Sequence, residues 1–155
     1  MKKLIMAVAC AAALAATPVL AADLPAGGMT AAELVAWLQK AGYPAQVKKG
    51  EKNDYLTSSA EGYSFNIDLY DCHDTPRCGS IRFVMGIDLK DGMTLQRANE
   101  WNHGERYASV FLDEESDPYL GYDVNLTPGV TYEGLDDDFS TWRMMLRTFR
   151  DFLNE

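Results

Sequence analysis

Two cysteines, Cys72 and Cys78, stand between two segments in which apolar residues alternate with polar or small ones. Residues 63–70 and residues 80–89 each show this alternation, which is typical of a β-strand with one buried face. A connection this short between two such segments favours a β-hairpin, and two cysteines near its tip favour one register. The chain is therefore predicted to contain an antiparallel hairpin whose strands meet at Cys72 and Cys78.

The side chains on both faces of this hairpin support the register in which Cys72 faces Cys78. Each large apolar residue of the first strand then meets one of the second, the pairs being Leu69 with Ile81, Ile67 with Phe83, Phe65 with Met85 and Tyr63 with Ile87. On the opposite face, Asp68 lies against Arg82. A shift by one residue would turn the apolar side chains of one strand to solvent, so we expect this alignment.

The first residues have the pattern of a secretory signal peptide. Two lysines precede an apolar stretch, residues 4–16, that is too short to span a bilayer, and a cleavage site ends at Ala21. The alternative is a lipoprotein signal at Cys10, but the apolar run before Cys10 is very short and the later cleavage site fits better. We therefore predict cleavage after Ala21 and export to the periplasm.

Cleavage after Ala21 divides the chain into a signal peptide at residues 1–21, a loose leader at residues 22–29 and a single domain at residues 30–155. Cleavage of the signal peptide removes two of the 14 Lys and Arg residues and none of the 23 Asp and Glu residues, so the net charge changes from −9 to −11. Such acidity opposes binding to nucleic acid or to an anionic membrane surface. The sequence has no second long apolar run, so we expect no membrane contact after cleavage.

Removal of Cys10 with the signal peptide leaves two cysteines in an oxidising compartment, and we expect them to form a disulfide. The alternative is a metal site in which both cysteines and the adjacent His73 are ligands, with His103 completing the set. A zinc site normally has a second pair of ligands at short spacing, which this chain lacks. We therefore predict a structural disulfide between Cys72 and Cys78, with no metal and no cofactor.

Hydrophobic periodicity predicts three helices and several strands. Thr30 and Glu33 form a capping box before the first helix, and Thr94 caps a second helix with Leu95 on its apolar face. The last helix has the strongest periodicity, and we expect Asp136–Asp138 in its positive first turn. The expected strands are residues 45–48, 55–58, 63–70, 80–89, 107–112 and 119–126.

Antiparallel strands with helices packed on one face make an α+β fold of two layers, an antiparallel sheet and a helical layer. We write the order of elements as αβββαββα, with one long hairpin before the second helix and another after it. Trp37, Trp101 and Trp142 fall one to each helix on the apolar faces. This is the pattern of a protein core and not of an aromatic binding platform.

Several spaced motifs extend over most of the chain. They are Tyr70-Asp71-Cys72 with Cys78, Ile81-Arg82-Phe83, Asn99-x-Trp101-Asn102 and Asp117-Pro118-x-Leu120-x-x-Asp123-Val124. Across about residues 28–153 the chain resembles the YbjN family of bacterial proteins, which carries the label of a sensory transduction regulator. The resemblance implies a fold like that of the class I type III secretion chaperones, αβββαββα. It implies no catalytic residues, because the family has no catalytic motif.

The histidines and an acidic turn at residues 113–117 are the remaining candidates for chemistry. His103 ends a helix beside Gly104, where a cation interacts favourably with the last carbonyls, so we interpret it as a cap. Neither histidine lies in a recognisable nucleophile motif. The acidic turn does not match a calcium-binding EF-hand loop, because Pro118 stands where the loop needs Gly and Val124 where it needs Glu. We therefore predict that the protein is not an enzyme.

Together these features predict an exported, non-enzymatic binding or chaperone-like regulatory module of the periplasm. The alternative is a small metal-dependent or hydrolytic enzyme that uses His103 and acidic residues. The sheet face that the helices leave uncovered carries the candidate binding residues, which are Asp68, Tyr70, Arg82, Val84 and Asp123. A mixed polar surface of this kind suits a protein partner or a second copy of the chain in a homodimer.

Overall fold

The computed structural model of the chain describes residues 22–51 and 53–154. The predicted signal peptide, residues 1–21, lies outside the described residues. In chain order the elements are β1 (Met29–Thr30), α1 (Ala31–Lys40), β2 (Ala45–Lys48), β3 (Tyr55–Ala60), β4 (Tyr63–Tyr70), β5 (Arg77–Cys78), β6 (Ser80–Gly86), α2 (Leu95–Gly104), β7 (Ser109–Leu112), β8 (Pro118–Asn125) and α3 (Tyr132–Leu153).

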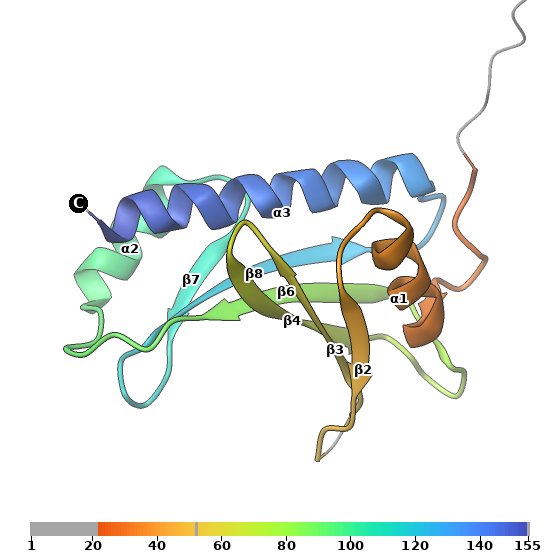
Figure 1. The fold of residues 1–155 in the computed structure, drawn as a ribbon, viewed down its shortest axis with the longest axis horizontal. Coiled ribbons are helices and arrows are strands. Elements are labelled where there is room, and N and C mark those ends of the chain that lie inside the picture. The colour runs from red at the N-terminus through yellow and green to blue at the C-terminus, as the bar shows by residue number, and fades with distance from the viewer. Residues whose placement is uncertain (1–21, 52, 155) are drawn as a thin grey trace, which may run out of the picture.

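Six strands form one antiparallel sheet in the order β2-β3-β4-β6-β8-β7, and β1 pairs with β5 in a small second sheet. Helix α3 runs along one face of the large sheet, with α1 and α2 toward its opposite ends (Figure 1). The buried side chains of the sheet and of all three helices form one core cluster between these layers. The α+β fold class predicted from the sequence is confirmed.

The order of elements is longer than αβββαββα. Four strands of the large sheet, β2, β3, β4 and β6, lie between α1 and α2. They match the four expected ranges 45–48, 55–58, 63–70 and 80–89, whereas the written order has only three strands there. Strands β1 and β5 were not expected, and each has only two residues. A two-residue strand has no alternation to detect, so hydrophobic periodicity cannot reveal it.

The hairpin of β4 and β6 has the predicted register. Its ladder runs from Asn66 opposite Val84 to Tyr70 opposite Ser80, and it pairs Asp68 with Arg82. The second strand is shorter than expected, because β6 ends at Gly86 and the next backbone amide, that of Ile87, donates to the Pro118 carbonyl at 3.1 Å. The ladder ends with Asn66 opposite Val84, so the predicted pairings of Phe65 with Met85 and of Tyr63 with Ile87 lie outside it.

Each helix contributes one tryptophan to the core, as predicted. Trp37 packs edge-on against Phe139 with ring centroids 5.5 Å apart, and Trp101 packs edge-on against Phe149 at 5.0 Å. Trp142 is fully buried and stacks on the ring of Phe83 in β6 at 5.6 Å. These contacts join α1 and α2 to α3, and α3 to the sheet, so the aromatic residues hold the helical layer in place.

Two details of the helices differ from the prediction. Helix α3 begins at Tyr132 after the N-cap Thr131, so Asp136–Asp138 lie in its second turn and not in its first. Two of these acids instead join elements, since Asp136 accepts a hydrogen bond from the Trp37 indole and Asp138 one from the Tyr122 hydroxyl, both at 2.7 Å. Leu95, expected on the apolar face of α2, is 74% exposed.

Residues 22–29 are packed against the domain and do not form a loose leader. The Leu24 amide donates to the Val130 carbonyl at 2.8 Å, and the Tyr132 amide donates to the Ala22 carbonyl at 2.9 Å. Leu24 and Met29 are both buried in the core cluster. The leader therefore runs beside the start of α3, a long-range pairing that its own sequence does not signal.

Candidate functional site

The face of the large sheet that points away from the helices is called the open face below. Its side chains come from outward positions of five strands, namely Tyr55 and Thr57 (β3), Asn66, Asp68 and Tyr70 (β4), Arg82 and Val84 (β6), Tyr119 and Asp123 (β8) and Phe111 (β7). All of them are at least partly exposed. All five residues predicted as binding residues belong to this face, so the structure brings them together on adjacent strands.

An ion pair lies at the centre of the open face. The Arg82 Nε and Nη2 atoms donate to the two carboxylate oxygens of Asp123, each at 2.7 Å. These hydrogen bonds raise the pKa of Arg82 above its ordinary value. A two-point contact between a guanidinium and a carboxylate fixes the orientation of both groups, so the charge at this position is held in a defined geometry.

Asp68 lies on the other side of Arg82 and has no comparable partner. The backbone register places it directly opposite Arg82, as predicted, but the guanidinium hydrogen-bonds to Asp123 instead. Among the described residues, none donates a hydrogen bond to the Asp68 carboxylate. Partial burial raises the pKa of Asp68, and the positive charge of Arg82 offsets only part of this shift.

The end of the open face formed by β7 and β8 is aromatic. Phe111 and Tyr119 stack with ring centroids 5.4 Å apart, and Phe111 is 44% exposed. A Cβ atom on Gly86 would lie 2.7 Å from the Tyr119 ring, and one on Gly121 would lie 3.4 Å from the Phe111 ring. The two glycines therefore leave room for the rings close to the backbone of β6 and β8.

Phe111 and Tyr119 were not among the residues predicted to bind. Their positions were visible in the sequence, because residues 107–112 and 119–126 were both expected to be strands and alternation assigns each residue to a face. Asp123 of residues 119–126 was placed on this face, so Tyr119 and Phe111 could have been placed there as well. The sequence did not show how close they lie to Arg82, which depends on the pairing of β8 with β6. A sequence pattern assigns faces within a hairpin but does not say which strands of different hairpins are neighbours.

At the opposite end, the open face continues into two hollows around Tyr70, which is 44% exposed. The smaller, of about 160 Å³, is lined by Asn53, Asp54, Tyr55, Asp68, Leu69 and Tyr70. The larger, of about 790 Å³, shares four of these residues and extends over the disulfide to Thr30 at the start of α1. Acidic and aromatic side chains therefore lie together at this end of the open face.

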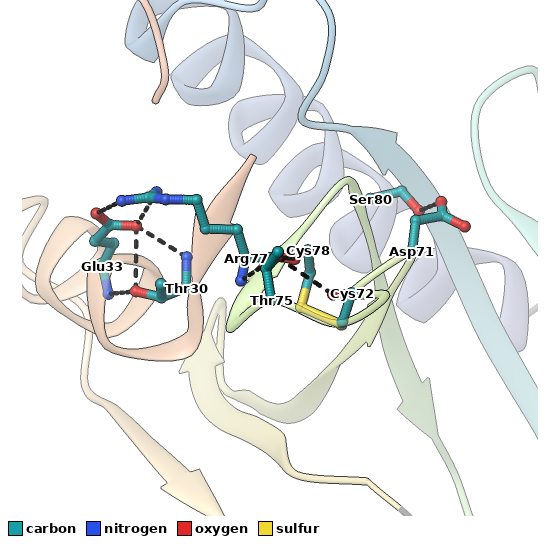
Figure 2. The surroundings of a disulfide bond; sticks show 8 residues. All are labelled: Thr30, Glu33, Asp71, Cys72, Thr75, Arg77, Cys78 and Ser80. Carbon is teal, nitrogen blue, oxygen red and sulfur yellow. Dashed lines mark hydrogen bonds and ion pairs between the residues drawn. A yellow bond between two sulfur atoms is a disulfide. The ribbon is translucent and has the colours of Figure 1, made fainter. Parts of the chain in front are cut away.

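The loop that joins β4 to β6 is held by a disulfide between Cys72 and Cys78, and Figure 2 shows how this loop contacts α1. Arg77 makes a two-point contact with the Glu33 carboxylate at 2.8 and 2.9 Å. Glu33 also accepts from the Thr30 amide at 2.9 Å, which completes the predicted capping box. The hydrogen bonds from Arg77 and then from the Thr30 amide lower the pKa of Glu33.

The same loop also contacts the residues before α1. The Arg77 guanidinium donates to the Gly28 carbonyl at 2.9 Å, and β5 pairs with β1 so that Cys78 lies opposite Met29. Gly28 has φ of +90°, and a Cβ atom at this position would lie 1.9 Å from the Cys78 carbonyl oxygen. The disulfide loop, the leader and the start of α1 therefore form one packed unit at this end of the sheet.

The two histidines lie on segments at opposite ends of the sheet (Figure 1). His73 is exposed in the disulfide loop, and His103 is exposed in the last turn of α2. Within residues 22–51 and 53–154, no group of three or more His, Cys, Asp or Glu side chains is arranged to hold a metal ion. No helix in this part of the chain is both long enough and apolar enough to cross a membrane.

The edges of the large sheet differ from its open face. The side-chain amide of Asn102 accepts a hydrogen bond from the Val110 amide at 2.8 Å and donates to the Val110 carbonyl at 3.0 Å. Asn102 thus occupies the ladder positions that a further strand would use next to β7. The opposite edge, β2, has only four residues and ends in Lys48, followed by Lys49. Short edge strands and edge lysines both discourage strand addition.

Comparison with known proteins gives one family. Residues 30–155 match the model of the YbjN family, described as "Putative bacterial sensory transduction regulator". Searches of curated proteins and of solved structures returned no match. The family model extends from the N-cap of α1 to the end of the chain and so includes the open face, the disulfide loop and all three helices. The chain therefore belongs to the YbjN family.

Proposed function

We propose that this protein is an exported, non-enzymatic regulatory module of the periplasm that binds another protein through its open face. The observation that carries the proposal is the composition of that face. It combines a fixed ion pair, Arg82 with Asp123, and partly exposed aromatic rings at both of its ends. Aromatic residues and arginine are the side chains most enriched where proteins bind one another.

The other surfaces of the described chain support recognition less well. Both edges of the sheet carry features that discourage strand addition, as described above for Asn102 and β2. The helices use their apolar faces in the core, and Leu95 and Met144 are isolated exposed apolar residues of the kind common on protein surfaces. The enzymatic alternative requires His103 to lie in a site with acidic residues. Its side chain is instead exposed to solvent in the last turn of α2.

The proposal is tested by comparing two double variants in a capture experiment. The open-face variant is Val84→Arg with Phe111→Ala, and the matched control is His73→Ala with His103→Ala. Each tagged variant is expressed with its N-terminal segment, crosslinked in intact cells and purified, and bound proteins are quantified by mass spectrometry. The open-face variant should lose the captured protein, while the histidine variant should keep it. Loss in the histidine variant alone contradicts the proposal.

The same experiment decides whether the partner is a second copy of the chain. If the crosslinked protein is the chain itself, sedimentation of the purified protein should show a dimer, and the Val84→Arg and Phe111→Ala changes should convert it to a monomer. If another protein is captured, the purified chain should sediment as a monomer at the same concentration. Either result supports binding through the open face.

Export is tested independently of binding. We expect mass spectrometry of the protein recovered from the periplasmic fraction to give Ala22 as the first residue, because the predicted cleavage site ends at Ala21. The Cys10→Ser variant should be processed at the same position, since this cysteine is not expected to be lipidated. A lipid-modified N-terminus at Cys10, or an intact N-terminus, contradicts the prediction.

A further inference from the structure

We propose that the partner inserts a cationic side chain, the guanidinium of an arginine or the ammonium of a lysine, at the corner of the open face formed by Tyr55, Asp68 and Tyr70. This inference rests on the proposed function, because it names the chemistry that the same face recognises. It commits to a protein partner with a basic exposed segment.

The first step concerns the Asp68 carboxylate. Its nearest cation across the ladder is Arg82, whose Nε and Nη2 atoms both donate to Asp123. Among the side chains that the structure describes, no donor hydrogen-bonds to Asp68, although this residue is only partly exposed. A carboxylate that is partly removed from water and lacks a donor gains more from an incoming cation than a fully solvated carboxylate does.

The second step concerns the neighbours of Asp68. Tyr55 is its direct cross-strand partner in β3, and Tyr70 is two residues further along β4 on the same face. Cross-strand partners and residues two apart on one strand have adjacent side chains, so an aromatic ring stands on two sides of the carboxylate. Aromatic faces attract guanidinium and ammonium groups, and this attraction adds to that of the carboxylate.

The third step concerns size. The hollow that these side chains line has a volume of about 160 Å³. Sites for drug-sized molecules have volumes of roughly 300 to 1,000 Å³, so this hollow is too small for such a ligand. It suits the head group of one side chain, with the rest of the partner lying over the sheet. The adjoining larger hollow shares Asn53, Asp54, Leu69 and Tyr70 with it and provides space for the flanking residues.

The fourth step is charge complementarity. The chain without residues 1–21 has a net charge of −11, and this corner contributes the carboxylates of Asp54, Asp68 and Asp71. Lys49 pairs with Asp54 at 2.6 Å, and the Ser80 hydroxyl donates to Asp71 at 2.6 Å, so Asp68 is the one of these three carboxylates that receives no hydrogen bond from residues 22–51 and 53–154. A strongly negative surface attracts basic partners and repels acidic ones.

The test uses three small probes, N-acetyl-arginine amide, N-acetyl-lysine amide and the uncharged N-acetyl-citrulline amide. Each is titrated into the ¹⁵N-labelled chain starting at Ala22, and amide shifts are followed by NMR. The two cationic probes should shift amides of β3 and β4 around Asp68, while the citrulline probe should leave them unchanged. The relative shifts for arginine and lysine show which cation the corner prefers.

The variants are Asp68→Asn and, as a control with the same change in charge, Asp88→Asn. Asp88 is exposed in the segment that follows β6. Asp68→Asn should weaken binding of the cationic probes by at least about fivefold, the loss expected for one charge-assisted hydrogen bond, and Asp88→Asn should not. Because no described side chain donates a hydrogen bond to Asp68, Asp68→Asn should unfold at a temperature no lower than the parent. A loss of probe binding would then not result from a loss of folding.

Equal probe binding by the parent and Asp68→Asn, or shifts located elsewhere on the chain, would overturn the inference. These outcomes are distinct from failure of the proposed function. If the Val84→Arg and Phe111→Ala variant loses the captured protein but Asp68→Asn retains it fully, the open face binds its partner without this cation and only the further inference fails. If neither change affects capture, the proposed function fails as well.

Discussion

At the scale of single residues, the structure shows that the same residue type has different roles in different surroundings. Gly28 and Gly42 both have φ close to +90°, yet the space around them differs. A Cβ atom on Gly28 would meet the Cys78 carbonyl oxygen at 1.9 Å, whereas one on Gly42 would meet nothing within 4 Å. Gly42 therefore serves only the backbone conformation at the end of α1, while Gly28 also permits contact between the leader and the disulfide loop.

This comparison gives the first prediction. Gly42→Ala should lower the free energy of unfolding by about 1 kcal/mol, the cost of a left-handed conformation for a residue with a Cβ atom. Gly28→Ala should cost more than Gly42→Ala, because the backbone of β5 must also move away from β1. Urea denaturation of both variants measures the difference. Equal losses would show that the contact between Gly28 and Cys78 does not constrain this end of the sheet.

Glu33 provides a prediction about pH. Its pKa is lowered in the folded chain, chiefly by hydrogen bonds from Arg77. A carboxyl with a lowered folded-state pKa stabilises the fold above its unfolded pKa and loses this contribution as pH falls through the folded value. Glu33→Gln should therefore destabilise the chain at pH 7 by less than about 1 kcal/mol, because both partners are partly exposed.

The pH dependence separates this ion pair from the capping role of Glu33. Gln at the same position can still accept a hydrogen bond from the Thr30 amide. The difference in melting temperature between the parent and Glu33→Gln should be largest near pH 7. It should shrink as the pH falls below 4.5, the ordinary pKa of a glutamate carboxyl. A difference that is constant from pH 7 to pH 3 would assign the effect to geometry rather than to the charge.

At the scale of elements, the disulfide loop is held by more than its disulfide. Strand β5 pairs with β1, and Arg77 contacts both Glu33 and the Gly28 carbonyl. In the loop-entropy model, a disulfide that closes a loop of this size stabilises the fold by about 2.4 kcal/mol, and real disulfides often contribute less. The contacts of β5 and Arg77 do not involve the sulfur atoms, so the loop should keep its position when the disulfide is absent.

These contacts predict how the chain responds to loss of the disulfide. The double variant Cys72→Ser and Cys78→Ser should lose about 2 kcal/mol or less of unfolding free energy and retain the helical circular dichroism of the parent. Chemical denaturation measures the loss, and the reduced parent serves as the control with unchanged sequence. Thiol labelling of the unfolded, unreduced parent should find no free cysteine in the chain that starts at Ala22. Complete unfolding of the double variant would mean that the neighbouring contacts are insufficient.

The edge strand β7 gives a prediction about association. The Asn102 side chain satisfies both backbone groups of Val110, so Asn102→Ala should expose these groups and cost about 1 to 2 kcal/mol. The exposed edge should also promote self-association that increases with concentration. The control is Asn99→Ala, an exposed asparagine of the same helix. Sedimentation that shows the same monomer for both variants would mean that Asn102 does not protect this edge.

Across the whole molecule, the sequence predicted correctly the features that depend only on residues of one hairpin or one helix. The register of β4 and β6 was correct because alternation, the cysteine pair and the facing of Asp68 and Arg82 all depend on neighbouring segments. The capping box of Thr30 and Glu33 was correct for the same reason. These predictions needed no knowledge of how distant segments meet.

Features that depend on distant contacts were missed. The leader packs against the start of α3 through Ala22 and Leu24, and no local signal identifies Val130 or Tyr132 as its partners. The partner of Arg82 is Asp123 rather than Asp68, because strand β8 lies on the other side of β6 and offers a carboxylate in better geometry. Neighbouring strands of different hairpins are set by the packing of the whole core, which periodicity does not describe.

The proposed function requires that the open face is the surface that contacts a partner. The most direct measurement places a photo-crosslinking amino acid at Tyr70 or Phe111 on this face, and at Leu95 of α2 or Met144 of α3 as controls. All four side chains are at least 39% exposed, so their accessibility does not bias the comparison. The account predicts a specific crosslinked protein from the two open-face positions and none from the two helical positions. Crosslinking from Leu95 or Met144 alone would contradict it.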